Sequence, residues 1–283
     1  MARISLLVLF FSLLPVESAQ AGPWPRKHRS GYLQIGASAI AYDQIYNADA
    51  EKEPTHTDVR DRVVQLYADF GLSDILTVTA MVPYKFLSAT PTEGSADSQG
   101  RTAATNAGIA DIDVLVRINW LQSRGYALSG EVLFGLPTGD DRDAHGLILG
   151  DGEFNIMPRL LFGTSFYPAP FYVTADVGYN FRGTGFSDDV QFNAEVGYGL
   201  FSGRLYLIML LSGQISTMTE PTRDTPAVAL GLDNNNREFL AFTPKVLYRL
   251  GGGFGLVVSY ATATGGRNVA AGAVLAANLF YEF

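Results

Sequence analysis

The sequence has 283 residues, with 28 acidic against 20 basic residues and a formal net charge of −8. It contains no cysteine, which excludes a disulfide framework, and its acidic balance argues against nucleic acid as a partner. The 30 glycines, 18 phenylalanines and 14 tyrosines are typical of outer-membrane β-barrels, where aromatic rings form interface girdles and glycine suits bent strands.

The N-terminus has the features of a secretory signal peptide. Arg3 supplies a positive charge, residues 4–16 form an apolar run, and an A-x-A cleavage site follows. We therefore expect residues 1–21 to be removed on export, which leaves residues 22–29 as a short periplasmic segment. No later apolar run reaches the roughly 18 residues of a membrane-spanning helix.

The remainder, residues 30–283, contains about twelve segments in which apolar and polar residues alternate, as in a strand whose two faces have different surroundings. The segments span about 30–43, 59–70, 75–86, 108–121, 126–136, 152–166, 171–181, 190–200, 205–217, 238–250, 254–263 and 268–283. The ninth has the weakest pattern, and its register stays open. Short turns and longer loops alternate between them, as in outer-membrane barrels of even strand number. The sequence therefore predicts an all-β, transmembrane, antiparallel up-and-down β-barrel of about 12 strands, with both termini in the periplasm.

The last segment is long enough to cross a bilayer obliquely, which takes about 9–11 residues. A strand in lipid must have both edges paired, so a closed barrel is required. Its final residues, Leu279, Tyr281 and Phe283, resemble the C-terminal signature of bacterial outer-membrane barrels. That resemblance implies outer-membrane lipid as the surroundings and the barrel-assembly machinery as a partner that binds this strand.

Six charged residues fall near mid-height on inward faces of the predicted strands: Arg117, Glu131, Arg159, Asp176, Glu195 and Lys245. The first four alternate in sign along neighbouring strands, where opposite charges attract each other. Two interpretations remain open. The charges either pack and neutralise a narrow barrel or form a charged constriction that filters solutes. A count of about 12 strands does not decide, because it lies between filled barrels of about eight strands and wide channels of sixteen or more.

Catalysis has little support in the sequence, so we expect no enzyme. The three histidines lie before the first strand or in loops, and no G-x-S-x-G motif occurs, so a nucleophile beside a base is not indicated. These histidines are His28, His56 and His145. The acidic stretch 140–143, with Asp151 and Glu153 downstream, raises the alternative of a divalent-cation site. It lacks the spacing of a calcium loop, and a solvated charged loop is the simpler interpretation, so no metal and no cofactor are predicted.

Three motifs resemble those of a known family. They are YADFGLSDI at 67–75, AGIADID at 107–113 and LFGLPTGD at 133–140. They are similar to segments of the MetA-pathway phenol-degradation family of outer-membrane transporter-like proteins. The resemblance implies a barrel that passes hydrophobic or aromatic compounds, and it carries over no functional residue. Within the third motif, Pro137 is expected to end the fifth strand, because proline cannot donate a ladder hydrogen bond.

Together these features predict an outer-membrane channel or transporter for passive passage of small molecules in a Gram-negative bacterium. The alternative is a closed structural or surface-interaction barrel without an open pore. A third hypothesis, less favoured than these two, is an outer-membrane enzyme that acts on lipid. The solute is not identified by the sequence.

Overall fold

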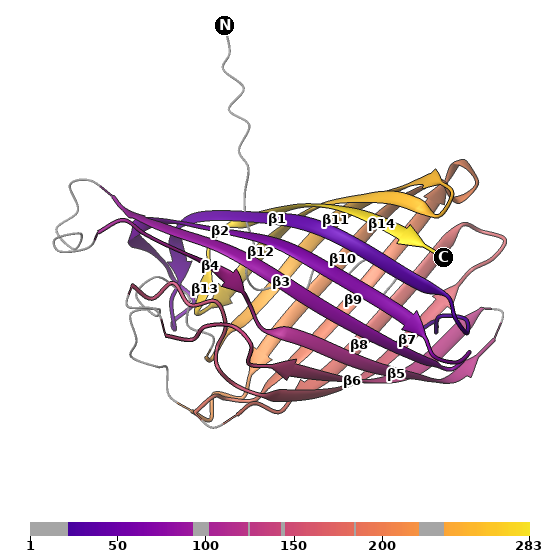
Figure 1. Ribbon diagram of the computed structural model, residues 1–283, viewed down its shortest axis with the longest axis horizontal. Helices are drawn as coiled ribbons and strands as arrows, with labels where there is room; N and C mark the ends of the chain where they lie inside the picture. Colours follow the sequence, from indigo (N-terminus) through magenta and orange to yellow (C-terminus); the bar gives the residue numbers. More distant parts are fainter. Residues whose placement is uncertain (1–21, 93–101, 124, 143–144, 184, 221–234) are drawn as a thin grey trace, which may run out of the picture.

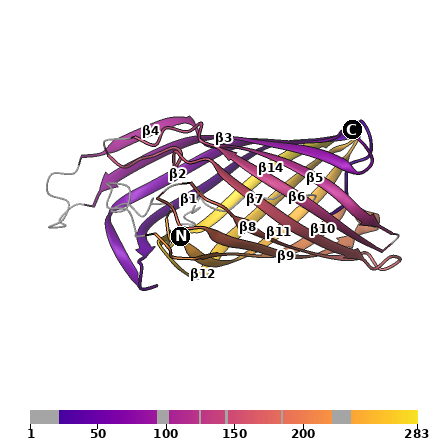
Figure 2. The same ribbon diagram turned by 90° about the horizontal axis from the view of Figure 1, so that it is seen from below.

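The computed structural model describes residues 22–92, 102–123, 125–142, 145–183, 185–220 and 235–283. Its strands form one antiparallel sheet that closes on itself (Figures 1 and 2). The strands are β1 (Gly31–Tyr46), β2 (Lys52–Gly71), β3 (Leu76–Pro91), β4 (Ala104–Ile109), β5 (Ile112–Gln122), β6 (Tyr126–Leu136), β7 (Asn155–Ser165), β8 (Phe171–Asn180), β9 (Asp189–Leu200), β10 (Leu205–Ser216), β11 (Glu238–Gly251), β12 (Phe254–Arg267), β13 (Val269–Ala270) and β14 (Ala273–Glu282). One short 3₁₀ helix, Phe201–Gly203, lies between β9 and β10.

Closure is made by β1, which pairs with β2 on one edge and with β14 on the other. The ladder with β14 runs from Tyr32 opposite Glu282 to Ala39 opposite Leu275. Because β4 and β5 are two parts of the fourth barrel strand, and β13 and β14 two parts of the twelfth, the barrel has twelve strands in the part of the chain described. The predicted antiparallel barrel is confirmed.

The fourth strand is divided by a bulge. Met81 of β3 pairs with Asp113, whereas Tyr84 pairs with Ile109, so an extra residue stands on the β4–β5 side. Bulges of this kind bend a strand and re-aim a side chain. The residue that gains a new direction here is Asp111, which belongs to one of the sequence motifs.

Side chains alternate between the lipid-facing surface and the lumen as expected. On β2, Val64, Leu66 and Phe70 are exposed, while Tyr67 and Asp69 are buried. The weakly patterned ninth segment is resolved as β10, with Ile208 and Leu210 inward and Leu207 outward. Exposed aromatic rings occur near both ends of the strands, on the outer face. They include Trp120, Tyr126, Phe166, Phe254 and Tyr281 near one end and Tyr84, Phe154, Phe181 and Tyr260 near the other.

The predicted bounds of the first three strands were too short. β2 begins at Lys52 rather than at residue 59, and β3 ends at Pro91 rather than at residue 86. Figure 1 shows β1, β2 and β3 projecting beyond the other strands. Charged residues and Pro54 suggested a loop, but beyond a membrane both faces of a hairpin can meet water, so polarity there does not exclude a ladder. The predicted sixth barrel strand was instead too long, since it begins at Asn155 rather than at residue 152.

The two ends of the barrel differ. We call the end that carries the short connections and the last residue, Phe283, the turn end, and the opposite end the loop end (Figure 1). The tight turn between β11 and β12 uses Gly251, Gly252 and Gly253, all with positive φ (105°, 61° and 86°), a conformation that favours glycine. Among the described residues, no helix is long and apolar enough to span a membrane.

Candidate functional site

Residues 22–29, the N-terminal segment, lie in the opening at the turn end. Pro23 is buried, and its carbonyl oxygen accepts hydrogen bonds from Ser129 Oγ and from Asn119 Nδ2 (3.4 Å). Both donors are lumen-facing side chains of β5 and β6. The segment therefore enters the mouth of the barrel instead of extending away from it.

Arg26 fixes the other half of the segment. Its Nε lies 3.5 Å from Asp69 Oδ2, its Nη1 lies 3.4 Å from Glu282 Oε1, and its guanidinium carbon lies 5.0 Å from the centre of the Tyr32 ring. The backbone N–H of Arg26 also donates to Thr77 Oγ1 (3.0 Å). These contacts join the segment to β1, β2, β3 and β14, the strands around the closing seam.

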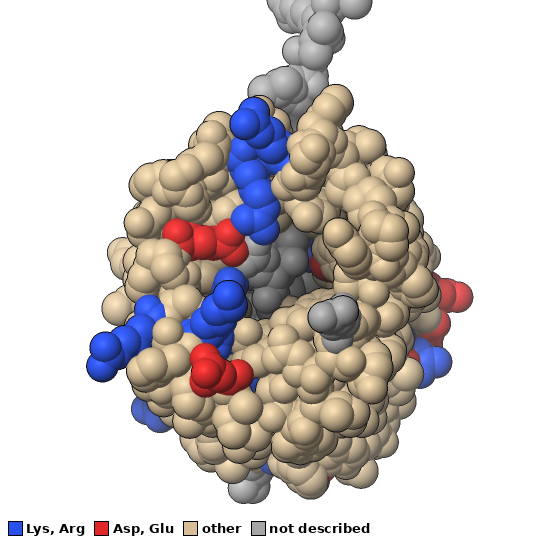
Figure 3. All heavy atoms as spheres, turned by 90° about the vertical axis from the view of Figure 1, so that its right-hand side faces the viewer, with Lys and Arg blue, Asp and Glu red and all other residues tan. Residues whose placement is uncertain are grey.

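The segment does not fill the opening. A cavity of about 270 Å³ remains between it and the wall formed by β8, β10 and β11. Its lining residues combine aromatic, aliphatic and basic side chains: Trp24, Arg26, Tyr172, Tyr206, Leu247 and Arg249. Figure 3 looks onto the turn end and shows the hollow opening, with basic and acidic side chains gathered along one side of its rim.

The first four charged residues predicted for the lumen form one continuous chain of ion pairs. Arg117 Nη2 lies 2.7 Å from Glu131 Oε2, and Arg159 Nη1 lies 3.1 Å from Glu131 Oε1. Arg159 Nη2 in turn lies 2.6 Å from Asp176 Oδ1, which also accepts from Asn193 Nδ2 (3.1 Å). Opposite charges on neighbouring strands thus satisfy each other across β5 to β9.

The remaining two predicted residues form a separate pair. Lys245 Nζ donates to Glu195 Oε2 at 3.0 Å, and Tyr172 Oη donates to Glu195 Oε1 at 2.8 Å. Since Lys245 belongs to β11 and Glu195 to β9, the lysine reaches across β10. We call the six residues together the charged belt. Whether the belt limits passage stays a prediction.

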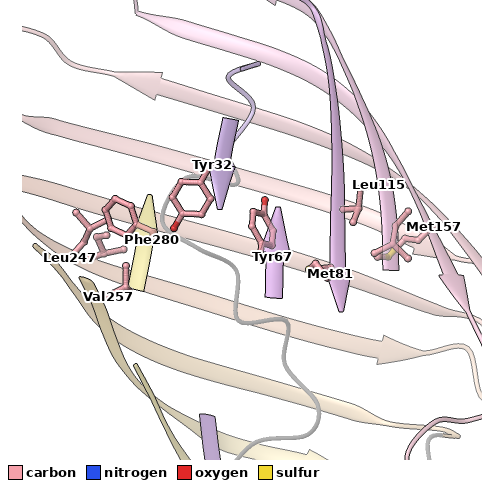
Figure 4. Close-up of a cluster of buried hydrophobic side chains, with 10 residues drawn as sticks. Tyr32, Tyr67, Met81, Leu115, Met157, Leu247, Val257 and Phe280 are labelled. Atoms are coloured by element: carbon pink, nitrogen blue, oxygen red, sulfur yellow. The ribbon is translucent and has the colours of Figure 1, made fainter. Parts of the chain in front are cut away.

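A ring of buried apolar side chains lies beside the charged belt. Figure 4 shows these side chains extending inward from strands around the barrel. This apolar ring consists of Tyr32, Tyr67, Met81, Leu115, Leu133, Met157, Ile208, Leu247, Val257 and Phe280. Its three aromatic members are in contact: the rings of Tyr32 and Phe280 stack with 5.3 Å between their centres, and the ring of Tyr67 meets that of Tyr32 edge-on at 5.8 Å. The apolar ring was not predicted from the sequence.

The two sets of side chains interleave on the same strands. On β5 the apolar Leu115 stands two residues before Arg117, and on β6 Leu133 stands two residues after Glu131. Because the two strands run in opposite directions, both apolar residues lie on the loop-end side of the charged ones. On β11 the order is reversed, because Leu247 follows Lys245 on a strand that runs toward the turn end, so the apolar ring is inclined relative to the charged belt.

The connection between β6 and β7, described at residues 137–142 and 145–154, folds into the loop end. We call it the inward loop. Its acidic residues Asp151 and Glu153 pair with Arg182, whose Nη2 lies 3.2 Å from Asp151 Oδ2 and which also contacts Glu153. Burial raises the pKa of the Glu153 carboxyl to about 7; Arg182 opposes this shift and Asp151 adds to it. In the described residues no group of three or more His, Asp or Glu side chains could hold a metal ion, while Asp143 of the predicted acidic stretch lies outside them.

The three histidines lie apart from the charged belt. His28 is at the turn end, where its Nδ1 is 2.9 Å from the carbonyl oxygen of Leu72. His56 is on the extended part of β2, not in the loop where it was predicted, and His145 is in the inward loop.

The predicted C-terminal assembly signature lies on the outer face of β14. Leu279, Tyr281 and Phe283 are 43%, 36% and 52% exposed. Phe283 is joined to Gly31 by backbone hydrogen bonds in both directions (2.9 and 3.1 Å). The signature therefore sits at the seam that closes the barrel; its recognition by an assembly partner stays a prediction.

Comparison with protein families gives a match over residues 48–279 to the family described as "Putative MetA-pathway of phenol degradation". The chain belongs to this family. The resemblance noted in its motifs is thereby confirmed over most of the sequence. Comparison with curated proteins gave no match.

Solved structures with the same fold include outer-membrane channels and porins at low identity. The COG4313 outer membrane channel from Pseudomonas putida F1 aligns with a TM-score of 0.71 at 12% identity, covering 94% of this chain and 100% of that one. The KdgM porin aligns with a TM-score of 0.53 at 7% identity, covering 89% and 99%. The NanC porin aligns with a TM-score of 0.50 at 8% identity, covering 89% and 100%. These likenesses place this member of the family among outer-membrane-type barrels.

Proposed function

We propose that this protein is a passive channel for small molecules in the bacterial outer membrane. The observation that carries the proposal is the cavity of about 270 Å³ beside the N-terminal segment. It lies inside the mouth of a closed barrel, next to Tyr206 and Leu247, which belong to or pack against the apolar ring.

The volume of the cavity favours small solutes. Pockets for drug-sized ligands are about 300–1,000 Å³, so this cavity is suited to a single small ring or a short chain and not to an oligosaccharide. The apolar ring favours solutes with an apolar face, since aromatic and aliphatic surface is withdrawn from water there. Membership of a family whose description refers to phenol degradation supports the same class of hydrophobic or aromatic compounds.

The charged belt gives the proposed channel a second selective layer. Arg117, Glu131, Arg159 and Asp176 sum to no net charge, so the belt repels neither sign strongly. Only its more exposed members, such as Arg159 and Asp176 (8% and 11%), present hydrogen-bonding groups to a solute that leaves the apolar ring. The proposal thus assigns the channel to compounds that combine an apolar body with a polar group.

The same proposal includes a role for the C-terminal residues and an orientation for the barrel. The outward Leu279, Tyr281 and Phe283 act as the signal read by the barrel-assembly machinery, and both termini face the periplasm. No enzymatic step is proposed, because the lumen charges nearest the apolar ring are engaged with one another in ion pairs.

Osmotic swelling of liposomes containing the refolded chain 22–283 tests the proposal. Phenylalanine and glutamine share a zwitterionic head and differ in the apolar character of the side chain, and neither crosses lipid readily. We expect both to cause swelling, with phenylalanine entering faster. Entry of glutamine at an equal or higher rate would reject the apolar preference, and no entry of either solute would reject the channel.

The alternative, a closed barrel, is favoured by two observations. The lumen leaves little side-chain surface exposed, since the members of the apolar ring are 0–7% exposed and Arg117 and Glu131 are 2% and 1% exposed. The N-terminal segment is anchored in the turn end by Pro23 and Arg26 and takes up part of the opening. Swelling by neither solute with the intact chain, combined with swelling after removal of residues 22–29, would support this alternative.

A further inference from the structure

The inward loop reaches far from its own strands. It leaves β6 and returns to β7, yet its Leu147 and Leu149, 0% and 4% exposed, pack in one cluster with lumen-facing side chains of more distant strands. These come from β1, β2 and β3: Ile40, Tyr42, Val59, Leu87 and Ala89. In the sheet, β6 is followed by β5, then β3, β2 and β1. The loop must therefore cross the inner face of the neighbouring strands, where it takes up part of the lumen.

A single carboxylate holds both ends of this loop. Asp111, at the bulge of the fourth barrel strand, accepts the backbone N–H of Gly139 through Oδ1 and that of Asp151 through Oδ2, each at 2.9 Å. Gly150 packs so closely that a Cβ there would lie 2.3 Å from Asp111 Oδ1. The bulge thus has a defined consequence: it aims one acceptor at the start and the end of the loop.

Additional contacts fix the loop between these ends. Asn106 Nδ2 donates to the carbonyl oxygen of Leu147 at 2.8 Å. Thr138 accepts the N–H of Ile112 at 3.1 Å and donates to the carbonyl oxygen of Ala110 at 2.8 Å, which ties the start of the loop across the bulge. Arg182 holds the far end through Asp151, as described above. A loop that was simply exposed to solvent would not make this many hydrogen bonds and ion pairs with the barrel.

We propose that the inward loop is the element that limits solute size at the loop end, and that Asp111 is the positioning residue that keeps it in the lumen. The inference rests on the proposed channel function and names the part of the chain that restricts entry. The alternative is a purely structural role, in which the loop shields apolar side chains of the barrel wall and does not affect permeation. The two differ in what happens to permeation when the loop is released.

Substitution Asp111→Ala removes both acceptor oxygens and should release the loop. We expect the single-channel conductance to rise to a multiple of the wild-type value and a larger sugar, raffinose, to enter liposomes that exclude it with the wild-type chain. Asp140→Ala is the matched control. The Asp140 side chain accepts a hydrogen bond from Arg142 N (3.1 Å) within the exposed part of the same loop, so its loss should leave conductance unchanged.

A reversible crosslink tests whether holding the loop in the lumen restores the size limit. A Cβ at Gly108 would lie 2.8 Å from Leu149 Cδ1, so the pair Gly108→Cys/Leu149→Cys places two thiols close enough for a short, reducible bis-thiol crosslinker, formed on oxidation as a direct disulfide where the geometry allows, in a chain without native cysteine. In the Asp111→Ala background, oxidation should return conductance and the size limit to wild-type values, and a reductant should release them again. If Asp111→Ala does not fold, Leu147→Ser with Leu149→Ser releases the loop from its apolar contacts instead.

Release itself is measured separately, as the reaction of a maleimide with the thiol of Leu149→Cys. Faster labelling with unchanged conductance and size limit would overturn the inference while the channel function stands. Faster labelling in a protein that never conducts, with or without the loop held, would overturn the channel function as well. Labelling that Asp111→Ala does not accelerate would show that Asp111 is not the positioning residue.

Discussion

Replacing Arg159 by methionine should destabilise the barrel strongly, because it leaves two buried carboxylates without a shared partner. The side chains of Arg159, Glu131 and Asp176 are 8%, 1% and 11% exposed. Removing one member of a buried ion pair costs about 3–5 kcal/mol. Glu131 keeps Arg117 and Asp176 keeps Asn193, so we expect a loss near the lower figure, about 3 kcal/mol.

Urea unfolding of the protein refolded into lipid vesicles, followed by the fluorescence of its two tryptophans, measures this loss. Arg267→Met is the matched control: its partner is Glu238, the two side chains are 40% and 25% exposed, and about 1 kcal/mol or less is expected. Adding Asp176→Asn to Arg159→Met should recover part of the loss, because it removes the carboxylate left unpaired. An Arg159→Met variant no less stable than Arg267→Met would refute the reasoning that the charged belt is withdrawn from water.

The remaining predictions concern the two faces and the seam. Leu66→Arg places a charge in lipid and should lower the free energy of unfolding by about 2–4 kcal/mol in the same assay. Gln65→Arg, one residue away on the lumen side, should lower it clearly less. Equal losses would mean that the lipid-facing and lumen-facing sides are wrongly assigned. Phe283→Ala should lower the amount of folded, heat-modifiable protein in the outer membrane several-fold while refolding in detergent proceeds as in the wild type. Equal losses in cells and in detergent would assign Phe283 to barrel stability instead of assembly.

The barrel itself could be predicted because its strands alternate apolar and polar side chains with a period of two residues. Alternation such as that of Val64, Leu66 and Phe70 against Tyr67 and Asp69 records lipid on one side and lumen on the other over many strands. The same alternation brought the charged residues to the inward face and, through neighbouring strands, within ion-pair distance of one another. A local pattern was sufficient because, apart from the closing pair β1–β14, each barrel strand pairs with its neighbours in sequence.

What occupies the lumen could not be predicted in this way. The N-terminal segment and the inward loop have no period, and their positions depend on partners far away in sequence, such as Asn119 for Pro23 and Asp111 for Gly139. A weaker signal was present: Leu147, Ile148 and Leu149 form an apolar run inside a polar connection, which is costly in a solvated loop. The apolar ring was missed because its ten members come one from each of ten strands, so no single strand shows them as a pattern.

Single-channel recording tests the central claim most directly. The chain 22–283 and the chain 30–283, which lacks the N-terminal segment, would each be refolded and inserted into planar lipid bilayers. We expect stable ion-conducting steps from the first and larger steps from the second, because the cavity at the turn end widens when the segment is removed. Silent bilayers from both folded chains would contradict the claim that this barrel is a channel.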